Sequence, residues 1–272
     1  MIWNTQIASQ ADANQTIWLV EPGTPRAQKF SKLISTVQSN KRSMNIVPCA
    51  ATQTLKNKYI PRTVIKHSST VDGKITFTSD ATMQIGDGVV VMGWFGLYGN
   101  LTAYQPFCDF RGSGQTSGFV MLGGPTTPNQ VYADFRKSGG SAGNSGVTTI
   151  PLLTVDNPLT HIAIFHHNIK NIGYVIDVWV DGIFYKTMTA TAMVPTPTGT
   201  ICHIGGSSTT GAPIMMQDFA VLPYANSIDV SRHLSGEILP QSLLHVRSLN
   251  NTIVDVSRYN RQLTIGSAVN IV

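Results

Sequence analysis

The chain contains 272 residues, of which 42% are hydrophobic and 12% are charged, and its formal net charge at pH 7 is +5. This length allows one large domain with an appendage or two small domains, with enough apolar side chains for a sizeable core. The charged fraction is about half of the usual share, so uncharged polar residues and Gly must dominate the surface. Such a surface is more typical of β-rich extracellular or assembly proteins than of cytosolic enzymes. No run of about 18 apolar residues is present, which excludes a membrane-spanning helix.

The positive charge is concentrated near the N-terminus. Residues 1–70 contain nine Lys or Arg side chains against two acidic ones, a net charge of +7. The remaining 202 residues contain ten basic and twelve acidic side chains, a net charge of −2. A basic arm can bind nucleic acid, but this one has few interleaved aromatic residues and no nucleic-acid-binding motif. We therefore expect it to dock on an acidic surface of another protein subunit.

Within this arm, residues 25–38 carry the pattern of a short helix. Thr24 can cap its start, and Pro25 suits the first helical position. Four apolar residues recur at helical spacing and form one stripe: Phe30, Leu33, Ile34 and Val37. Three basic residues lie off this stripe: Arg26, Lys29 and Lys32. We predict that these seven side chains dock the arm on a partner. An amphipathic helix packed on its own domain is the alternative.

The cysteines and the first residues bear on where the chain is made. Cys49, Cys108 and Cys202 are an odd number without the short spacing of a metal site, which favours buried free thiols. Residues 1–4 lack the basic and apolar regions that open a secretion signal. These features predict a chain that is made and assembled in the cytoplasm.

From residue 73 onward the sequence consists of short strand patterns separated by Gly, Pro, Asn and Ser. Ile75 and Phe77 share one face of an alternating, half-buried strand. Residues 89–97 are apolar at both parities, as in a strand buried between two layers. Asp181-Gly182 predicts a hairpin turn. Further strand patterns follow at residues 161–167, 174–180, 182–188 and 200–206. This regular spacing favours an antiparallel sandwich over alternating β and α units.

The order of these segments resembles the laminin-G-like, concanavalin A-like lectin/glucanase family. Residues 74–97 look like the opening strands of that family, with their core Trp. Residues 159–190 look like its "W-x-H-I-A … L-Y-V-D-G" segment, and residues 201–208 look like its "L-x-I-G-G" strand. The closing "D-D-V-x-I-Y … R-x-L-S-x-x-E-I" pattern is similar to residues 217–223 and 231–238.

The resemblance covers roughly residues 64–240 and departs from the family at Leu159, where the family usually has Trp. It implies an all-β fold, a two-sheet antiparallel jelly-roll sandwich, to which the residue pattern described above adds an N-terminal arm containing one short helix. The expected domains are the basic arm at residues 1–63, the jelly roll at 64–240 and a C-terminal extension at 241–272. The segment VIDVWVDGIFYKTMTA, residues 175–190, would form paired central strands.

The family includes sugar-binding modules, glycoside hydrolases, adhesion domains and structural domains, so fold alone does not decide the chemistry. Hydrolysis usually requires two carboxylates facing each other across the scissile bond, which the family's glucanases carry on a Glu-x-Asp-x-x-Glu strand. The only glutamates here are Glu21 and Glu237. Asp177 and Asp181 share strand parity, but Asp181 belongs to the turn. We therefore expect a protein that is not an enzyme.

The histidines do not predict a metal site. His161 and His167 share strand parity but lie six residues apart, roughly 20 Å along an extended strand, so they cannot hold one ion alone. Asp87 lies in the best oxygen-ligand loop for calcium, but no second acid is close in sequence. No metal or other cofactor is predicted.

Aromatic side chains near the expected loops can stack on sugar rings. The candidates for ligand binding are Tyr98, Tyr104 and Tyr132, with ordinary rim tyrosines as the alternative. Trp94 and Trp179 occupy core positions in the resemblance and are expected to pack in the interior.

Two functions remain open. The first is a structural virion protein, such as a bacteriophage head decoration, fibre or tail component, that displays a lectin-like jelly roll. Its terminal segments would attach it to other virion subunits, and it would form a homo-oligomer. The second is a carbohydrate-binding module without catalysis, with cell-surface glycans as ligands.

Overall fold

The computed structural model describes residues 63–84, 88–101, 104–124, 130–136, 145–149 and 159–272, and two strands near the N-terminus. The chain divides into two compact units, residues 1–60 and 61–272.

In the first unit, β1 (Trp18–Glu21) pairs antiparallel with β2 (Thr24–Lys29), and Glu21 lies opposite Thr24. The helix predicted near residues 25–38 is therefore wrong where it was expected to begin. In the sequence, the dipeptide Pro22-Gly23 between the two strands is a strong turn signal, and it favours this strand pairing over the helix that was expected to begin at residue 25. Arg26 and Lys29 lie on β2. The other predicted docking residues lie outside the described residues: Phe30, Lys32, Leu33, Ile34 and Val37.

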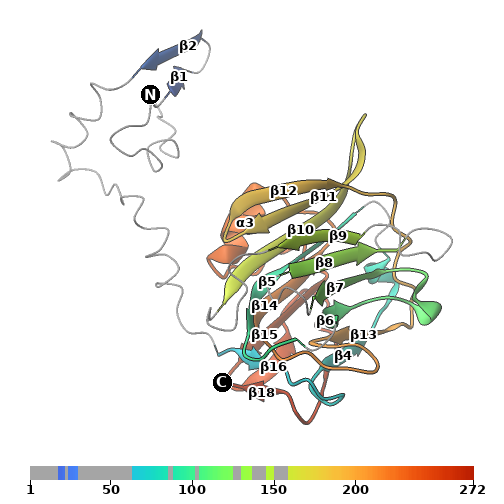
Figure 1. Ribbon diagram of the computed structural model, residues 1–272. Helices are drawn as coiled ribbons and strands as arrows, with labels where there is room; N and C mark the ends of the chain where they lie inside the picture. Colours follow the sequence, from blue (N-terminus) through green and yellow to red (C-terminus); the bar gives the residue numbers. More distant parts are fainter. Residues whose placement is uncertain are drawn as a thin grey trace, which may run out of the picture. The chain divides into compact units, whose positions relative to one another are not determined.

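In the second unit, the described strands form two antiparallel sheets that face each other (Figure 1). The nine-stranded sheet has the order β12-β11-β10-β5-β14-β15-β16, and β3 and β18 join it beside β14. Its strands are β3 (Ile65–Lys66), β5 (Gly88–Leu97), β10 (Thr160–Ile169), β11 (Gly173–Val180), β12 (Ile183–Thr189), β14 (Ile214–Leu222), β15 (Leu244–Leu249), β16 (Thr252–Asp255) and β18 (Asn270–Ile271).

The seven-stranded sheet has the order β17-β4-β13-β6-β7-β8-β9. Its strands are β4 (Ile75–Thr78), β6 (Gln105–Asp109), β7 (Phe119–Gly123), β8 (Gln130–Phe135), β9 (Ser145–Thr149), β13 (Ile201–Ile204) and β17 (Thr264–Ile265). The predicted jelly-roll sandwich is confirmed, and it is consistent with the concanavalin A-like fold that the sequence resembles.

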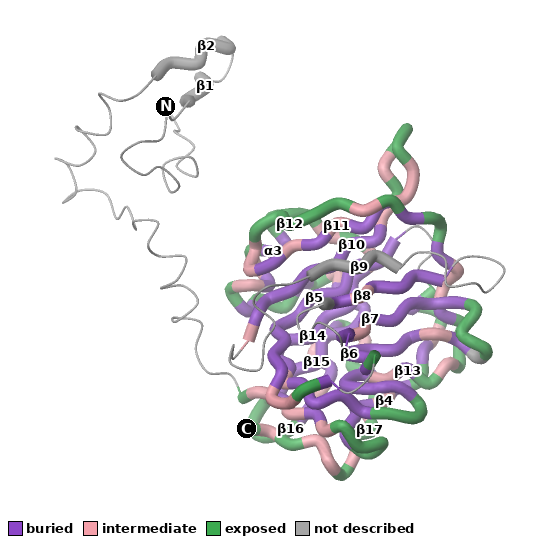
Figure 2. The backbone as a smooth tube through the Cα atoms, in the orientation of Figure 1, coloured by how far each residue is buried: buried purple, intermediate pink, exposed green. Residues whose placement is uncertain are grey.

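The core lies between the two sheets and is rich in phenylalanine. Phe107 of β6 stacks on Phe95 of β5 with ring centroids 5.9 Å apart, and Phe110 meets Phe219 of β14 edge to face at 6.2 Å. The predicted inward residues of β4 are buried, in agreement with the alternating pattern. Figure 2 shows that the buried stretches follow the strands of both sheets. Cys108 and Cys202 are buried free thiols, as expected, and Cys49 lies outside the described residues.

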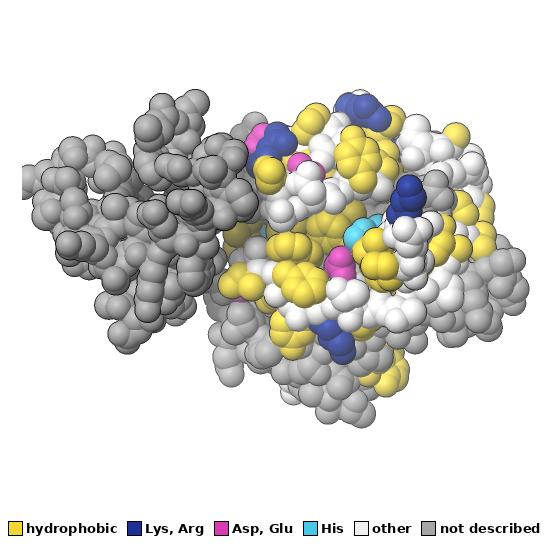
Figure 3. Space-filling view, turned by 90° about the horizontal axis from the view of Figure 1, so that it is seen from above, with side chains coloured by type: hydrophobic (Ala, Val, Ile, Leu, Met, Phe, Trp, Pro, Cys, Tyr) yellow, Lys and Arg dark blue, Asp and Glu magenta, His cyan; other side chains and the backbone are white. Residues whose placement is uncertain are grey.

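The predicted hairpin turn at Asp181-Gly182 is confirmed, because Val180 pairs with Ile183 and both turn residues have positive φ angles of 51° and 80°. The two strands are not central, however. β12 forms the edge of the nine-stranded sheet, and almost all of its residues are exposed, Phe184 and Tyr185 among them. Figure 3 shows hydrophobic side chains gathered on the face seen from above.

The segment 241–272, which was expected to be an extension, belongs to the sandwich. β15 and β16 continue the nine-stranded sheet beyond β14, and β17 pairs with β4 of the other sheet. Leu244 and Val246 are fully buried in the common core. The jelly roll therefore does not end at residue 240.

A helix, α3 (Ser227–Leu234), covers part of the outer face of the nine-stranded sheet. Asn226 caps it, and Asn226 and Asp229 form a reciprocal capping box. Val230 packs in a small second cluster with Val90 and Met92, the outward residues of β5. No helix among the described residues is long and apolar enough to cross a membrane.

Three fully buried histidines lie in this outer layer. His161 and His233 share a hydrogen bond of 2.9 Å, and the ring of His245 lies 5.3 Å from that of His233. Next to His245, Asp218 accepts a hydrogen bond of 2.6 Å from Arg247. Asp218 has a φ angle of 50° at a break in the register of β14, and this bulge turns its side chain toward the histidines.

Burial lowers the pKa of His161 from 6.5 to about 3 and that of His67 from 6.5 to about 4. Both residues are neutral in the folded state above these values, whereas the unfolded chain protonates them as soon as the pH falls below 6.5. Between pH 6.5 and about 4 the unfolded state therefore binds more protons. Stability should fall with falling pH, by roughly 1.4 kcal/mol per pH unit for each histidine.

Denaturant unfolding of the full chain across this pH range checks the prediction. The slope should persist in 0.5 M NaCl because it arises from desolvation, which salt screens weakly. An unfolding free energy that stays flat between pH 6.5 and 4.5 would show that these histidines are protonated in the folded state.

Candidate functional site

One face of the seven-stranded sheet points away from the core and presents a row of paired residues. Paired residues in neighbouring strands lie on the same face of a sheet. The register across β4, β13, β6, β7 and β8 aligns Thr76, His203, Asp109, Val120 and Asp134. Their sequence neighbours face the core. We call this row and the side chains beside it the outward face.

The sequence Asp-Phe-Arg occurs twice on this sheet, at residues 109–111 and 134–136. In both copies the phenylalanine is buried in the core, so Asp and Arg lie on the outward face. β6 and β8 both pair antiparallel with β7, so they run parallel to each other, roughly 10 Å apart. The two copies therefore present the same groups in the same direction.

In each copy the arginine pairs with the aspartate two residues before it. Arg111 donates to both carboxylate oxygens of Asp109, at 2.8 and 2.7 Å, and its Nη1 donates to Oε1 of Gln115 at 2.9 Å. Arg136 and Asp134 form an ion pair of 2.8 Å. Each positive charge is thus balanced by a negative one.

The second copy keeps unused hydrogen-bonding capacity. Burial raises the pKa of Asp134, and the neighbouring Asp109 adds to this, although Arg136 and Arg111 oppose it. Asp134 is only 5% exposed, yet its Oδ1 has no hydrogen-bond partner in the described structure, and neither has Nε of Arg136. Buried polar groups are usually paired, so these two atoms are exceptions to that rule.

A groove with a volume of about 870 Å³ opens at the Arg111 end of the outward face. Its floor is formed by side chains of β6 and β13, and the turns at residues 112–117 and 197–200 form its walls. The side chains that line it include Asp109, Arg111, Gln115, Thr198, Ile201 and His203. Burial lowers the pKa of His203, and the positive charge of Lys74 lowers it further. Its imidazole is therefore neutral at neutral pH.

Hydrogen bonds hold the walls of the groove in place. Ser79 donates to the carbonyl of Pro197 at 2.6 Å, and Thr196 donates to the carbonyl of Phe110 at 2.9 Å. The backbone N–H of Gly118 donates to the carbonyl of Val194 at 2.7 Å. The groove is therefore preformed, which reduces the entropic cost of binding a ligand.

Of the three predicted tyrosines, the structure brings two together. Tyr132 lies on the outward face of β8, two residues before Asp134, and Tyr104 meets its ring edge to face at 5.1 Å. A hydrogen bond with Tyr104 raises the pKa of Tyr132. Tyr98 lies elsewhere: its hydroxyl donates to the carbonyl of His67 at 2.5 Å. The tyrosine pair and the Asp-Phe-Arg copies share one face, whereas Tyr98 does not belong to it.

The tryptophans and His167, which the sequence also singled out, contact neighbouring side chains of the fold. Trp94 is buried, but in the outer layer beside His161 rather than between the sheets, and Trp179 is partly buried there. His167 contacts Asp177 at 2.8 Å. Within the described residues, no cluster of three or more His, Cys, Asp or Glu side chains could hold a metal ion. Asp87 lies outside those residues.

No protein-family model matches the sequence, and no curated protein matches it either. Among solved structures, a native heptameric SAP-like pentraxin from Limulus polyphemus is 15% identical over 77% of this chain and 95% of its own, with a TM-score of 0.49. The binding domain of botulinum neurotoxin DC, solved in complex with rat synaptotagmin II, is 10% identical over 72% of this chain, with a TM-score of 0.47. The match spans about half, 53%, of that binding-domain chain. At these values the similarities carry no information about ligands.

Two glycines near the groove allow a comparison of how tightly the backbone is packed around it. Gly118 and Gly199 both have positive φ angles, 76° and 81°. A Cβ at Gly118 would lie 2.1 Å from the carbonyl oxygen of Phe110, whereas a Cβ at Gly199 would have nothing within 4 Å. Gly199→Ala should cost about 1–2 kcal/mol for the left-handed backbone alone. Gly118→Ala should cost clearly more, because the backbone also has to move. Denaturant unfolding measures both, and equal losses would contradict the packing described for Gly118.

Proposed function

We propose that the outward face of the seven-stranded sheet binds an uncharged saccharide without catalysis. The observation that carries the proposal is the combination of two Asp-Arg pairs and one tyrosine pair on a single face. Carboxylate and guanidinium groups are planar and form directional, paired hydrogen bonds, which suits the vicinal hydroxyls of a sugar. Aromatic rings suit its apolar C–H face. Ile201 supplies further apolar surface within the groove.

The charge balance supports an uncharged ligand. Each arginine is paired with its own aspartate, and His203 is neutral at neutral pH, so these groups add no net charge. A charged ligand would have to compete with an existing ion pair and would leave one of its partners buried and unpaired.

The carboxylates support binding rather than hydrolysis. Glycoside hydrolysis usually needs two carboxyl groups on opposite sides of the scissile bond. Asp109 in the groove already accepts hydrogen bonds from Arg111 with both oxygens. Glu237 is exposed on the surface and pairs with Arg232, away from the groove.

A glycan array of neutral and acidic saccharides tests this function on the full chain. We expect binding to neutral glycans, and about tenfold or greater weakening in Asp109→Asn and Tyr104→Ala, since each removes a direct contact. Tyr98→Phe is the matched control because Tyr98 lies off the outward face, and it should bind as the unsubstituted protein does. Binding that is absent, or restricted to acidic glycans, would refute the proposal.

We also propose that the protein is a virion component that displays this jelly roll on a particle, as a head decoration, fibre or tail subunit. Two observations support the proposal. Residues 1–60 form a unit of their own, and they contain seven basic residues against two acidic ones. The jelly-roll unit, residues 61–272, contains twelve of each. The net positive charge is thus concentrated in this N-terminal unit, which we propose attaches to an acidic neighbouring subunit.

Removing residues 1–60 tests this attachment. The remaining unit should stay folded, with an unchanged melting temperature, but should no longer sediment with the particles. Attachment of the full chain should weaken as salt rises. A truncated chain that still joins the particles with unchanged affinity would show that the N-terminal unit does not carry the attachment.

A further inference from the structure

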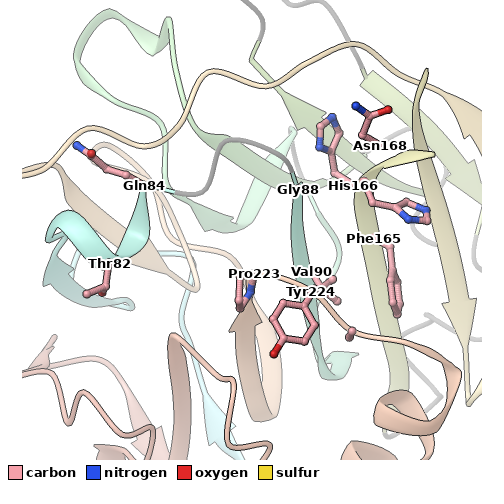
Figure 4. A pocket seen from close by; sticks show the side chains of 11 residues that line it. Thr82, Gln84, Gly88, Val90, Phe165, His166, Asn168, Pro223 and Tyr224 are labelled. Atoms are coloured by element: carbon pink, nitrogen blue, oxygen red, sulfur yellow. The ribbon is translucent and has the colours of Figure 1, made fainter. Parts of the chain in front are cut away.

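A second cavity, with a volume of about 480 Å³, lies at one end of the nine-stranded sheet. Figure 4 shows that its lining comes from four places: the turn at residues 82–84, the start of β5, the end of β10 and the loop at residues 223–225. Both cavities lie within the roughly 300–1,000 Å³ range typical of sites that hold small molecules. This cavity is not part of the outward face.

The lining of this cavity suits an uncharged ligand that has both apolar and hydroxyl-rich sides. Tyr224 is 66% exposed and offers an aromatic ring, while the buried Phe165 contributes a second apolar wall. Gln84 and Asn168 contribute exposed side-chain amides, which donate and accept hydrogen bonds. Of the described side chains that line it, none is Lys, Arg, Asp or Glu. A sugar ring has this combination of surfaces.

The two cavities adjoin each other. Nε2 of Gln84, which lines the second cavity, donates a hydrogen bond of 3.0 Å to Oγ1 of Thr198, which lines the groove. This hydrogen bond therefore joins the wall of the second cavity to the wall of the groove. A ligand that fills the groove can continue into the second cavity by passing over this contact.

The shared wall is anchored in the fold. Thr82 precedes Gln84 in the same turn, and its backbone N–H donates to Asp80 at 2.9 Å. Arg261, from the C-terminal segment, donates to Asp80 at 3.1 Å and also contacts the hydroxyl of Thr82. Arg261 is itself held by Asp255, which accepts a hydrogen bond of 2.9 Å from its backbone N–H. The turn that separates the two cavities is therefore positioned by polar contacts that connect it to the C-terminal segment.

We propose that the groove and the second cavity are successive subsites of one extended site, which takes a linear, uncharged oligosaccharide rather than a single terminal sugar. This inference rests on the saccharide-binding function proposed above. The chain of the ligand crosses the Gln84–Thr198 contact, with one part on the groove side and the next part against Tyr224. Linking two weak contacts in one molecule makes the second contact nearly intramolecular, so affinity rises with ligand length.

Binding of neutral glucan, mannan and galactan oligosaccharides from one to about eight units, measured by calorimetry on the full chain, tests the proposal. We expect affinity to rise by about tenfold or more once the ligand is long enough to reach the second cavity. In Tyr224→Ala and Gln84→Ala that gain should be lost, so that long ligands bind no better than short ones. Asp109→Asn, which changes the groove itself, should weaken ligands of every length.

Tyr185→Ala is the matched control, because Tyr185 is an exposed tyrosine, at 44%, that lines neither cavity. It should keep the full gain with length. Short sugars that bind as tightly as long ones would overturn the extended site while leaving the proposed function intact. A gain that survives in Tyr224→Ala and Gln84→Ala would also overturn it. If no neutral saccharide binds at any length, the proposed function itself fails, and the extended site with it.

Discussion

Burial of Phe110 and Phe135 between the two sheets is the constraint on which the candidate site depends. Each phenylalanine contributes aromatic contacts to the core, and Phe110 meets Phe219 of the opposite sheet. Successive residues of a strand point to opposite faces, so a buried phenylalanine forces the aspartate before it and the arginine after it outward. Burial of the two phenylalanines therefore decides which face of the sheet the charged pairs occupy.

The same dependence on distant packing appears at the shared wall. The turn at residues 82–84 is short, and Met83 buries its side chain in the core, while the polar residues on either side of it face outward. Arg261 fixes it from a segment about 180 residues further along the chain, through the pair of contacts to Asp80 and Thr82. The C-terminal segment therefore supports two parts of the molecule. Its strand β17 forms one edge of the seven-stranded sheet, and its Arg261 supports the wall of the site.

Sequence patterns predicted the parts of this molecule that depend on local chemistry. The alternation of Ile75 and Phe77 and the turn at Asp181-Gly182 are local signals, and both correspond to the structure. The position of β12 was not predictable in this way, because a strand that is apolar at both parities looks central even when it forms an edge. The repeat of Asp-Phe-Arg is visible in the sequence, but its meaning depends on the pairing of β6 and β8 with β7, which no local pattern encodes. The capping box of Asn226 and Asp229 could have revealed α3.

The edge strand β12 also affects how the molecule behaves in concentrated solution. An unpaired edge is a template for joining sheets of different molecules, and β12 presents seven residues of it. Two features oppose such joining. Lys186 places an ammonium group in the middle of the strand, and the irregular register at Val178/Trp179 adds local twist. A second copy aligned along β12 would have to desolvate that charge against a twisted partner, so open-ended fibre growth from this edge is disfavoured even though four of its seven side chains are apolar or aromatic.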